Sequence, residues 1–156
     1  MAREFLAGNS DLSSELIERI ADAISHHSDP PFSIGRHHES LIDKGALSKI
    51  IRDADAADAM GAAGLMRAFT SKSFLPEYDP ENLKGPAWGL SSVECGRLFS
   101  GRPPVKTIAD QINQQIRYYD GLHTETARRL CSPLVDFMRR FMLQLEAETA
   151  GNMGVA

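Results

Sequence analysis

The stretch from residue 46 to residue 69 constrains the fold most, because it has a long helical period and carries carboxylates on the apolar side of that period. At about 100° per residue, Asp58 falls near the middle of the apolar arc, Asp55 falls at its margin, and Asp53 faces solvent on the opposite side. We therefore expect one helix, which begins after Asp43 as its N-cap and runs to about Phe69. The arc consists of Leu47, Ile50, Ile51, Ala54, Gly61, Ala62, Leu65, Ala68 and Phe69.

The two inward carboxylates need partners, because an ionised carboxylate that is buried alone costs several kcal/mol or takes up a proton. The pattern predicts a metal ion, an arginine or a group of backbone donors near Asp55 and Asp58. Spacing alone leaves an internal salt bridge or a helix cap as the alternative. Gly61 and Gly64 indicate close approach by another helix, since glycine is costly in a helix interior. Arg67 lies off the arc, where it forms either a surface ion pair or a ligand contact.

Two further helices are predicted on either side of this stretch. Residues 11 to 27 have helical apolar spacing, with Asp11 or Ser13 as the N-cap and two prolines after the last turn. Downstream, Thr107 with Asp110 three residues later is a variant of the capping box, and it begins a helix that ends near residue 121.

A last helix begins at residues 124 to 126, and Pro133 should kink it or divide it, with Ser132 capping the second piece. Residues 70 to 106 are the least periodic part, so we expect them over the surface as a lid or an interface. Trp88 in that segment either packs against the fold or stacks a base.

These segments predict an all-α bundle of about four or five helices. Residues 1–10 would be an N-terminal extension, 11–148 the domain and 149–156 a tail. With 156 residues, one domain is the simplest organisation.

Charge and hydropathy exclude several classes of partner. The net charge of −4 makes a nucleic-acid partner unlikely, because phosphate binding depends on clustered Lys and Arg. No apolar run is long enough for a signal peptide or a membrane span, which predicts a cytoplasmic protein without a membrane partner. Cys95 and Cys131 have no CxxC spacing and are expected to be reduced.

Two separated runs resemble one known family. Residues 50–55 (IIRDAD), followed by Asp58-Ala59, a Gly61-x-x-Gly64 segment and Arg67, resemble the last metal-ligand helix of the HD-domain phosphohydrolase superfamily. Residues 124–128 (TETAR), with Phe137-Met138 and a closing 145–148 (LEAE), resemble the C-terminal signature of a bacterial branch of this superfamily, which the first run also resembles.

The resemblance implies an HD-domain-like helical bundle that hydrolyses a phosphate ester or a nucleotide with a divalent metal such as Mn, Mg, Zn or Fe. It implies that Asp55 is a metal ligand and that Asp58 is a supporting carboxylate or base. His27 would face the phosphate or the metal, although capping of the helix end by this histidine is the plainer interpretation.

The loop at residues 28 to 45 lies near the active-site mouth in related chains, so Arg36 and Lys44 would contact a phosphate there. The same loop carries His37, His38 and Glu39, which are either solvated or a second set of metal donors.

The chain also departs from the family pattern. HD-domain enzymes bind metal through an early His, a His-Asp pair and the late Asp, and this chain contains no His-Asp dipeptide. Ala56 and Ala57 stand where relatives have Arg-Leu. The chain thus resembles the C-terminal two-thirds of an HD domain that lacks the family's first helices, and we expect negligible hydrolase activity from it alone.

Three interpretations remain open. A partner chain supplies the missing ligands, or the chain is a non-catalytic interaction or nucleotide-binding subunit, or it is the product of a truncated gene. The first two predict an exposed apolar patch around Ile51, Leu65 and Phe69, which a homo-oligomer or a hetero-partner would cover.

Overall fold

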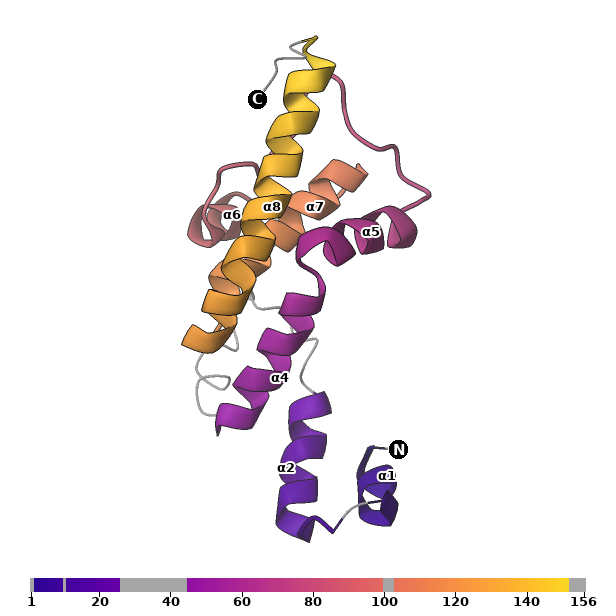
Figure 1. The fold of residues 1–156 in the computed structure, drawn as a ribbon, viewed down its shortest axis with the longest axis vertical. Coiled ribbons are helices and arrows are strands. Elements are labelled where there is room, and N and C mark those ends of the chain that lie inside the picture. The colour runs from indigo at the N-terminus through magenta and orange to yellow at the C-terminus, as the bar shows by residue number, and fades with distance from the viewer. Residues whose placement is uncertain (1, 10, 26–44, 100–102, 152–156) are drawn as a thin grey trace.

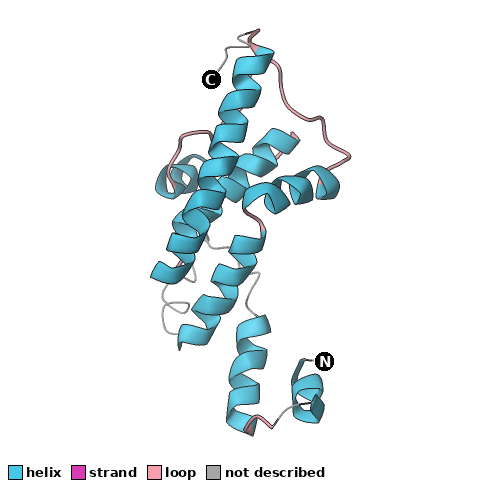
Figure 2. Ribbon diagram, in the orientation of Figure 1, coloured by secondary structure: helices cyan, strands magenta, loops and turns pink. Residues whose placement is uncertain are grey.

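A computed structural model of the chain describes residues 2–9, 11–25, 45–99 and 103–151. All regular secondary structure in these ranges is helical (Figure 2). The prediction of an all-α fold is confirmed, although the described ranges hold more than four or five helices. The elements are α1 (Ala2–Asn9), α2 (Ser14–Ser25), α4 (Gly45–Asp58), α5 (Gly61–Ser71), α6 (Ser92–Phe99), α7 (Ile108–Arg117), the 3₁₀-helix η1 (Tyr118–Gly121) and α8 (Glu125–Thr149).

The main core lies where α5 and α7 pack against α8. In Figure 1, α8 runs along the long direction of the molecule, and α5 and α7 cross it. Burial of one face of each helix supplies the hydrophobic stabilisation of this bundle. The apolar residues of the cluster that are least exposed include Ala68, Ala109, Ile112, Cys131, Val135, Met138 and Met142.

The two N-terminal helices form an arm on this bundle. α1 packs on α2, and α2 packs on α4, at the end of the molecule remote from the C-terminus (Figure 1). The hydroxyl of Ser13 accepts a hydrogen bond from the Leu16 amide, which identifies Ser13 as the residue that caps α2. The predicted N-terminal extension therefore contains a packed helix of its own.

The predicted single helix over residues 46 to 69 is wrong, because the chain turns between α4 and α5. The amides of Ala59 and Met60 donate to the carbonyls of Ala56 and Ala57, three residues earlier. Gly61 then has φ of 71°, a left-handed conformation that favours glycine. The helical period continues through this turn, so periodicity did not reveal it.

The two glycines of this region serve close packing in different ways. A Cβ on Gly61 would lie 3.1 Å from Cδ2 of Leu134 on α8, as expected for a helix that is closely approached. A Cβ on Gly64 would collide with the carbonyl of Ala59 in the turn just before α5. Both positions therefore require a residue without a side chain.

The segment from 70 to 106 is more ordered than its sequence suggested. It contains α6, and its chain is fixed to the start of α7 by hydrogen bonds from the amides of Ile108 and Ala109 to the carbonyls of Pro76 and Glu77. Trp88 is half-buried against the core, with Nζ of Lys84 5.3 Å from its ring centroid.

The predicted capping box at Thr107 and Asp110 is confirmed, with both reciprocal hydrogen bonds present. The predicted division of the last helix at Pro133 is wrong, since α8 is continuous from Glu125 to Thr149. The buried side chains of Cys131 and Val135 on either side of the proline hold the helix against the core. Within the described ranges, no helix is long and apolar enough to cross a membrane.

Replacing Gly61 by alanine tests the turn between α4 and α5. Gly61→Ala should lower the free energy of unfolding by about 2 kcal/mol, because alanine is strained at positive φ and its Cβ would press on Leu134. Gly89→Ala is the matched control: φ is 75° and no atom lies within 4 Å of the added Cβ, so it should cost about 1 kcal/mol. Equal losses in urea unfolding would show that the Leu134 contact has no effect.

Candidate functional site

The predicted site residues divide into those that the structure describes and those outside it. His27, Arg36 and Lys44 lie outside the described residues, as do the predicted N-cap Asp43 and the His37-His38-Glu39 cluster. The described part of the site is the carboxylate segment of α4 together with the start of α5.

The expected inward direction of Asp55 and Asp58 is wrong, because both side chains are exposed on the outer face of α4. Because the chain turns after Asp58, α4 and α5 bury different sides of the apolar arc that the sequence predicts over residues 46 to 69. On α5, the arc residues Leu65 and Ala68 are buried, whereas on α4 the same arc faces outward and leaves Ile50 55% exposed.

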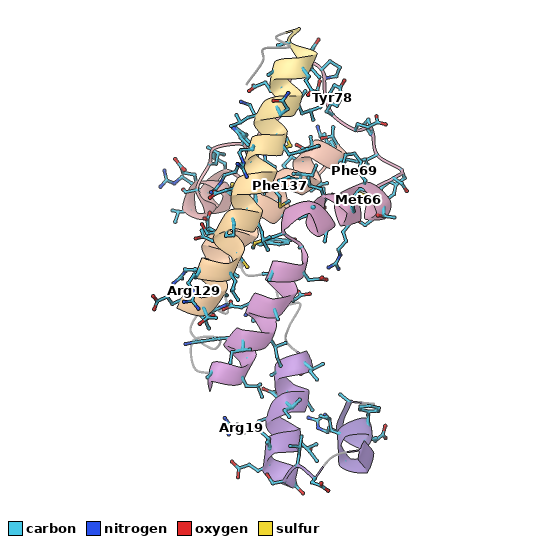
Figure 3. The ribbon with its side chains drawn as sticks, viewed as in Figure 1. Arg19, Met66, Phe69, Tyr78, Arg129 and Phe137 are labelled. Atoms are coloured by element: carbon cyan, nitrogen blue, oxygen red, sulfur yellow. The ribbon has the colours of Figure 1, made fainter. Side chains whose placement is uncertain are left out.

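The expected exposed patch is thus shifted along the chain. Leu65 is buried and Ile51 is half-buried, contrary to a fully open surface around them. Phe69 is exposed, as expected, and lies on α5 close to the more exposed Met66 (Figure 3). Exposed apolar side chains therefore occur on both helices, and on α4 they lie directly beside the carboxylates.

Asp58 has a partner at the surface. The guanidinium of Arg67 on α5 donates to the carboxylate of Asp58 and, at 3.3 Å, to its backbone carbonyl. Both side chains are more than half exposed, so the pair contributes little to stability. Spacing alone had left a salt bridge as the alternative for Asp58 and a surface ion pair as the alternative for Arg67. The structure pairs these two residues with each other.

Asp55 differs from its two acidic neighbours. Within the described ranges it has neither a hydrogen bond nor an ion pair, whereas Asp53 and Asp58 each bind other groups. Its carboxylate is exposed on the same side of α4 as Ala54 and Asp58. Asp55 is therefore the carboxylate of this helix that is available to a group outside the described chain.

Asp53, expected in solvent, is buried and ties α4 to the start of α8. Its Oδ2 accepts hydrogen bonds from the amide (2.8 Å) and hydroxyl (2.7 Å) of Thr124, and its Oδ1 accepts from the amide of His123 (2.8 Å). Nδ1 of His123 lies 3.0 Å from the same Oδ1. The carboxylate thus satisfies free amides at the positive end of the α8 dipole.

Burial by itself raises the pKa of Asp53, but the hydrogen bonds from His123 and Thr124 together outweigh it and hold that pKa below its usual value. Burial of the Cys131 side chain raises the pKa of its thiol, and the nearby negative charge of Asp53 raises it further. Both cysteines are free and buried, and their reduced state stays a prediction.

A metal site is not formed by the described residues alone. No group of three or more His, Cys, Asp or Glu side chains in those ranges is arranged to hold an ion. Asp55 offers one donor, and Asp53 already uses its oxygens within the fold. The metal-ligand role of Asp55 stays a prediction.

No family model matches the chain, and no curated protein matches it. Its fold is similar to that of a Lactobacillus plantarum protein whose crystal structure was determined as a Northeast Structural Genomics target, with a TM-score of 0.54 and 22% sequence identity. The similarity covers 93% of this chain and 64% of the L. plantarum chain. At this level of identity, the similarity concerns the fold.

Replacing Asp53 by asparagine tests the tie between α4 and α8. Asp53→Asn should lower the free energy of unfolding by about 2–3 kcal/mol, because a neutral amide cannot replace a charged acceptor of several donors. Asp58→Asn, which changes the same charge on the same helix at an exposed ion pair, should cost less than about 1 kcal/mol. Chemical unfolding at neutral pH measures both, and a loss at Asp58 as large as that at Asp53 would contradict this account.

The contribution of Asp53 should also depend on pH. Because its pKa in the folded state is depressed from the ordinary value of 3.8, the stabilisation is complete above pH 3.8 and is lost as pH falls through the lower, folded-state pKa. The difference in unfolding free energy between the wild type and Asp53→Asn should therefore shrink on acidification below pH 3.8. A difference that stays constant through this range would contradict the depressed pKa.

Proposed function

We propose that this chain is an incomplete HD-domain-like subunit of a metal-dependent phosphohydrolase, inactive by itself and completed by a partner chain. Asp55 offers one ligand to a divalent metal, and the partner covers α4 and offers the others. The substrate class is a phosphate ester or a nucleotide. The observation that carries the proposal is the exposed carboxylate of Asp55, on a helix that also exposes the apolar side chain of Ile50.

Helical spacing puts Ile50, Ala54 and Asp58 in one row, and it puts Asp55 one turn from Ile51 at the margin of the same face. Ile50 is 55% exposed and Ala54 is exposed, while Leu47 and Ile51, which lie between Ala54 and Asp55 by the same spacing, are half-buried. Apolar side chains grouped on a surface are typical of an interface. A partner that covers this face would also enclose the Asp55 carboxylate, which raises its affinity for a cation by excluding water.

The donors of the described residues do not by themselves fit a divalent metal, because one carboxylate leaves most of the coordination positions to water. We therefore assign to the described residues only the presentation of Asp55 and the apolar face around it. In the proposal, a partner chain offers the other ligands.

The remaining residues have roles that follow from the same proposal. Asp58 supports the metal or accepts a proton once its exposed pair with Arg67 opens, which costs little at a surface. His27 faces the metal or the phosphate, and Arg36 and Lys44 bind phosphate oxygens.

A second candidate is a non-catalytic HD-derived subunit that binds another protein or a nucleotide without hydrolysing it. The single available donor on α4 favours this alternative, because the exposed face would then serve only for docking. The two candidates differ in whether Asp55 contributes to metal binding in the completed assembly.

A chimera distinguishes them. The part of the L. plantarum chain that this chain does not cover would be fused to it, and the product assayed for bound manganese and for hydrolysis of bis(p-nitrophenyl) phosphate. We expect the chain alone to show neither, and the chimera to retain manganese and hydrolyse the diester. Asp55→Asn in the chimera should abolish both, because it removes a charged metal ligand.

Asp11→Asn is the matched control, since it removes an exposed carboxylate outside the helices and should leave both measurements unchanged. A folded chimera that binds no manganese, or that is unaffected by Asp55→Asn, would support the non-catalytic alternative. Hydrolysis by the chain alone that survives Asp55→Asn would contradict both candidates.

A further inference from the structure

A cavity of about 420 Å³ lies on a different part of the molecule from Asp55. Its walls come from the loop at residues 87–91, α6, α7, η1 and α8, and none of its lining residues belongs to α4 or α5. Its size falls within the range of small-molecule sites, which is roughly 300–1,000 Å³. We name it the Arg117 cavity, after the most deeply buried charged group in its wall.

Arg117 is 7% exposed, and among the described residues its guanidinium makes one hydrogen bond. Nη1 donates to the carbonyl of Ala87 at 3.0 Å, a neutral acceptor. Among the described residues, no carboxylate lies within ion-pair distance of the guanidinium. A buried charge without a counter-charge is costly, and a guanidinium cannot avoid that cost by losing its proton.

The surroundings of Arg117 show the same imbalance. Burial lowers the pKa of Arg117, and the more distant groups of Cys95, Asp120 and Asp110 act in the opposite direction without cancelling the effect. The carboxylate of Asp110 accepts the amides of Lys106 and Thr107, so it is already used in the capping of α7.

Other groups in the cavity wall indicate which anion would fit. Arg139 adds a second guanidinium at the rim, where its Nη1 also donates to Asp136 at 3.1 Å. Glu94 contributes a carboxylate that is held by the amide and hydroxyl of Ser91, and Asp120 contributes another. Two acidic groups near two guanidinium groups favour a ligand with a single negative charge over a polyphosphate.

Apolar side chains complete the wall. The indole of Trp88 and the side chains of Ile116 and Leu143 line the cavity, and Leu143 is 48% exposed. An aromatic ring would cover this apolar surface, while a planar anionic group would accept two hydrogen bonds from a guanidinium fork.

We propose that the Arg117 cavity is a binding site for a small aromatic monoanion, with Arg117 as its counter-ion and Trp88 against its ring. The acidic group is a carboxylate, because a phosphate monoester carries close to two negative charges at neutral pH. This site is separate from the proposed metal site and does not depend on it.

Trp88 is the single tryptophan of the chain, so its fluorescence reports on the cavity without labelling. The full-length chain would be titrated with benzoate, with phenyl phosphate and with neutral benzyl alcohol, in metal-free buffer. Benzoate should give a saturable change in emission, and phenyl phosphate, which is mostly a dianion at neutral pH, should bind more weakly. Benzyl alcohol should give none at the same concentrations.

Arg117→Met should weaken binding of the anion by about tenfold or more, because it removes a charged hydrogen-bond donor. Its melting temperature should equal or exceed that of the wild type, since the variant no longer buries an unpaired charge. A merely structural arginine would instead lower the melting temperature and leave binding by the folded fraction unchanged. Arg129→Gln, on α8 away from the cavity wall (Figure 3), should leave binding unchanged.

Arg139→Gln provides a second test that does not perturb the core, and it should weaken binding several-fold. Should Arg117→Met fail to fold, the result for Arg139→Gln decides the proposal. The proposal is overturned if benzoate does not change the emission of Trp88, if benzyl alcohol or phenyl phosphate binds as well as benzoate, or if a folded Arg117→Met binds as tightly as the wild type.

Discussion

The hydrogen bonds from His123 and Thr124 to the buried carboxylate of Asp53 fix how the rest of the structure is arranged. They join α4 to the first turn of α8 across about seventy residues of sequence, and they satisfy amides that a helix start would otherwise leave without partners. Once Asp53 faces α8, the rotation of α4 about its axis is determined. Asp55, which is about 160° from Asp53 at 100° per residue, must then lie on the outer side of that helix.

This dependence explains which parts of the structure the sequence could predict. Caps made by near neighbours were predictable: Ser13 caps α2, and Thr107 with Asp110 begins α7, because each involves residues within three positions of one another. In α7 the buried side chains of Ile112 and Ile116 lie one turn apart, a helical spacing that is visible in the sequence.

Features that depend on distant partners were not predictable in this way. Periodicity favoured burial of Asp55 and Asp58 because the arc counts apolar residues on both sides of a turn that does not interrupt the helical period. The close contact that a side chain at Gly61 would make is with Leu134, which is distant in the sequence. The burial of Asp53 follows from donors seventy positions later, and the Arg117 cavity forms where three separate stretches meet, residues 87–94, 113–120 and 139–143.

The arrangement around α4 has a thermodynamic consequence for the N-terminal arm. α2 packs on one part of α4, α8 packs on another, and among the described residues nothing covers the side chains of Ile50 and Asp55, which are exposed. A protein that docks on α4 only while this helix is folded stabilises the folded helix by mass action. It therefore also stabilises every helix whose packing needs a folded α4. Docking and the attachment of α1 and α2 are therefore linked, and slower amide exchange in α2 would signal a ligand that never contacts it.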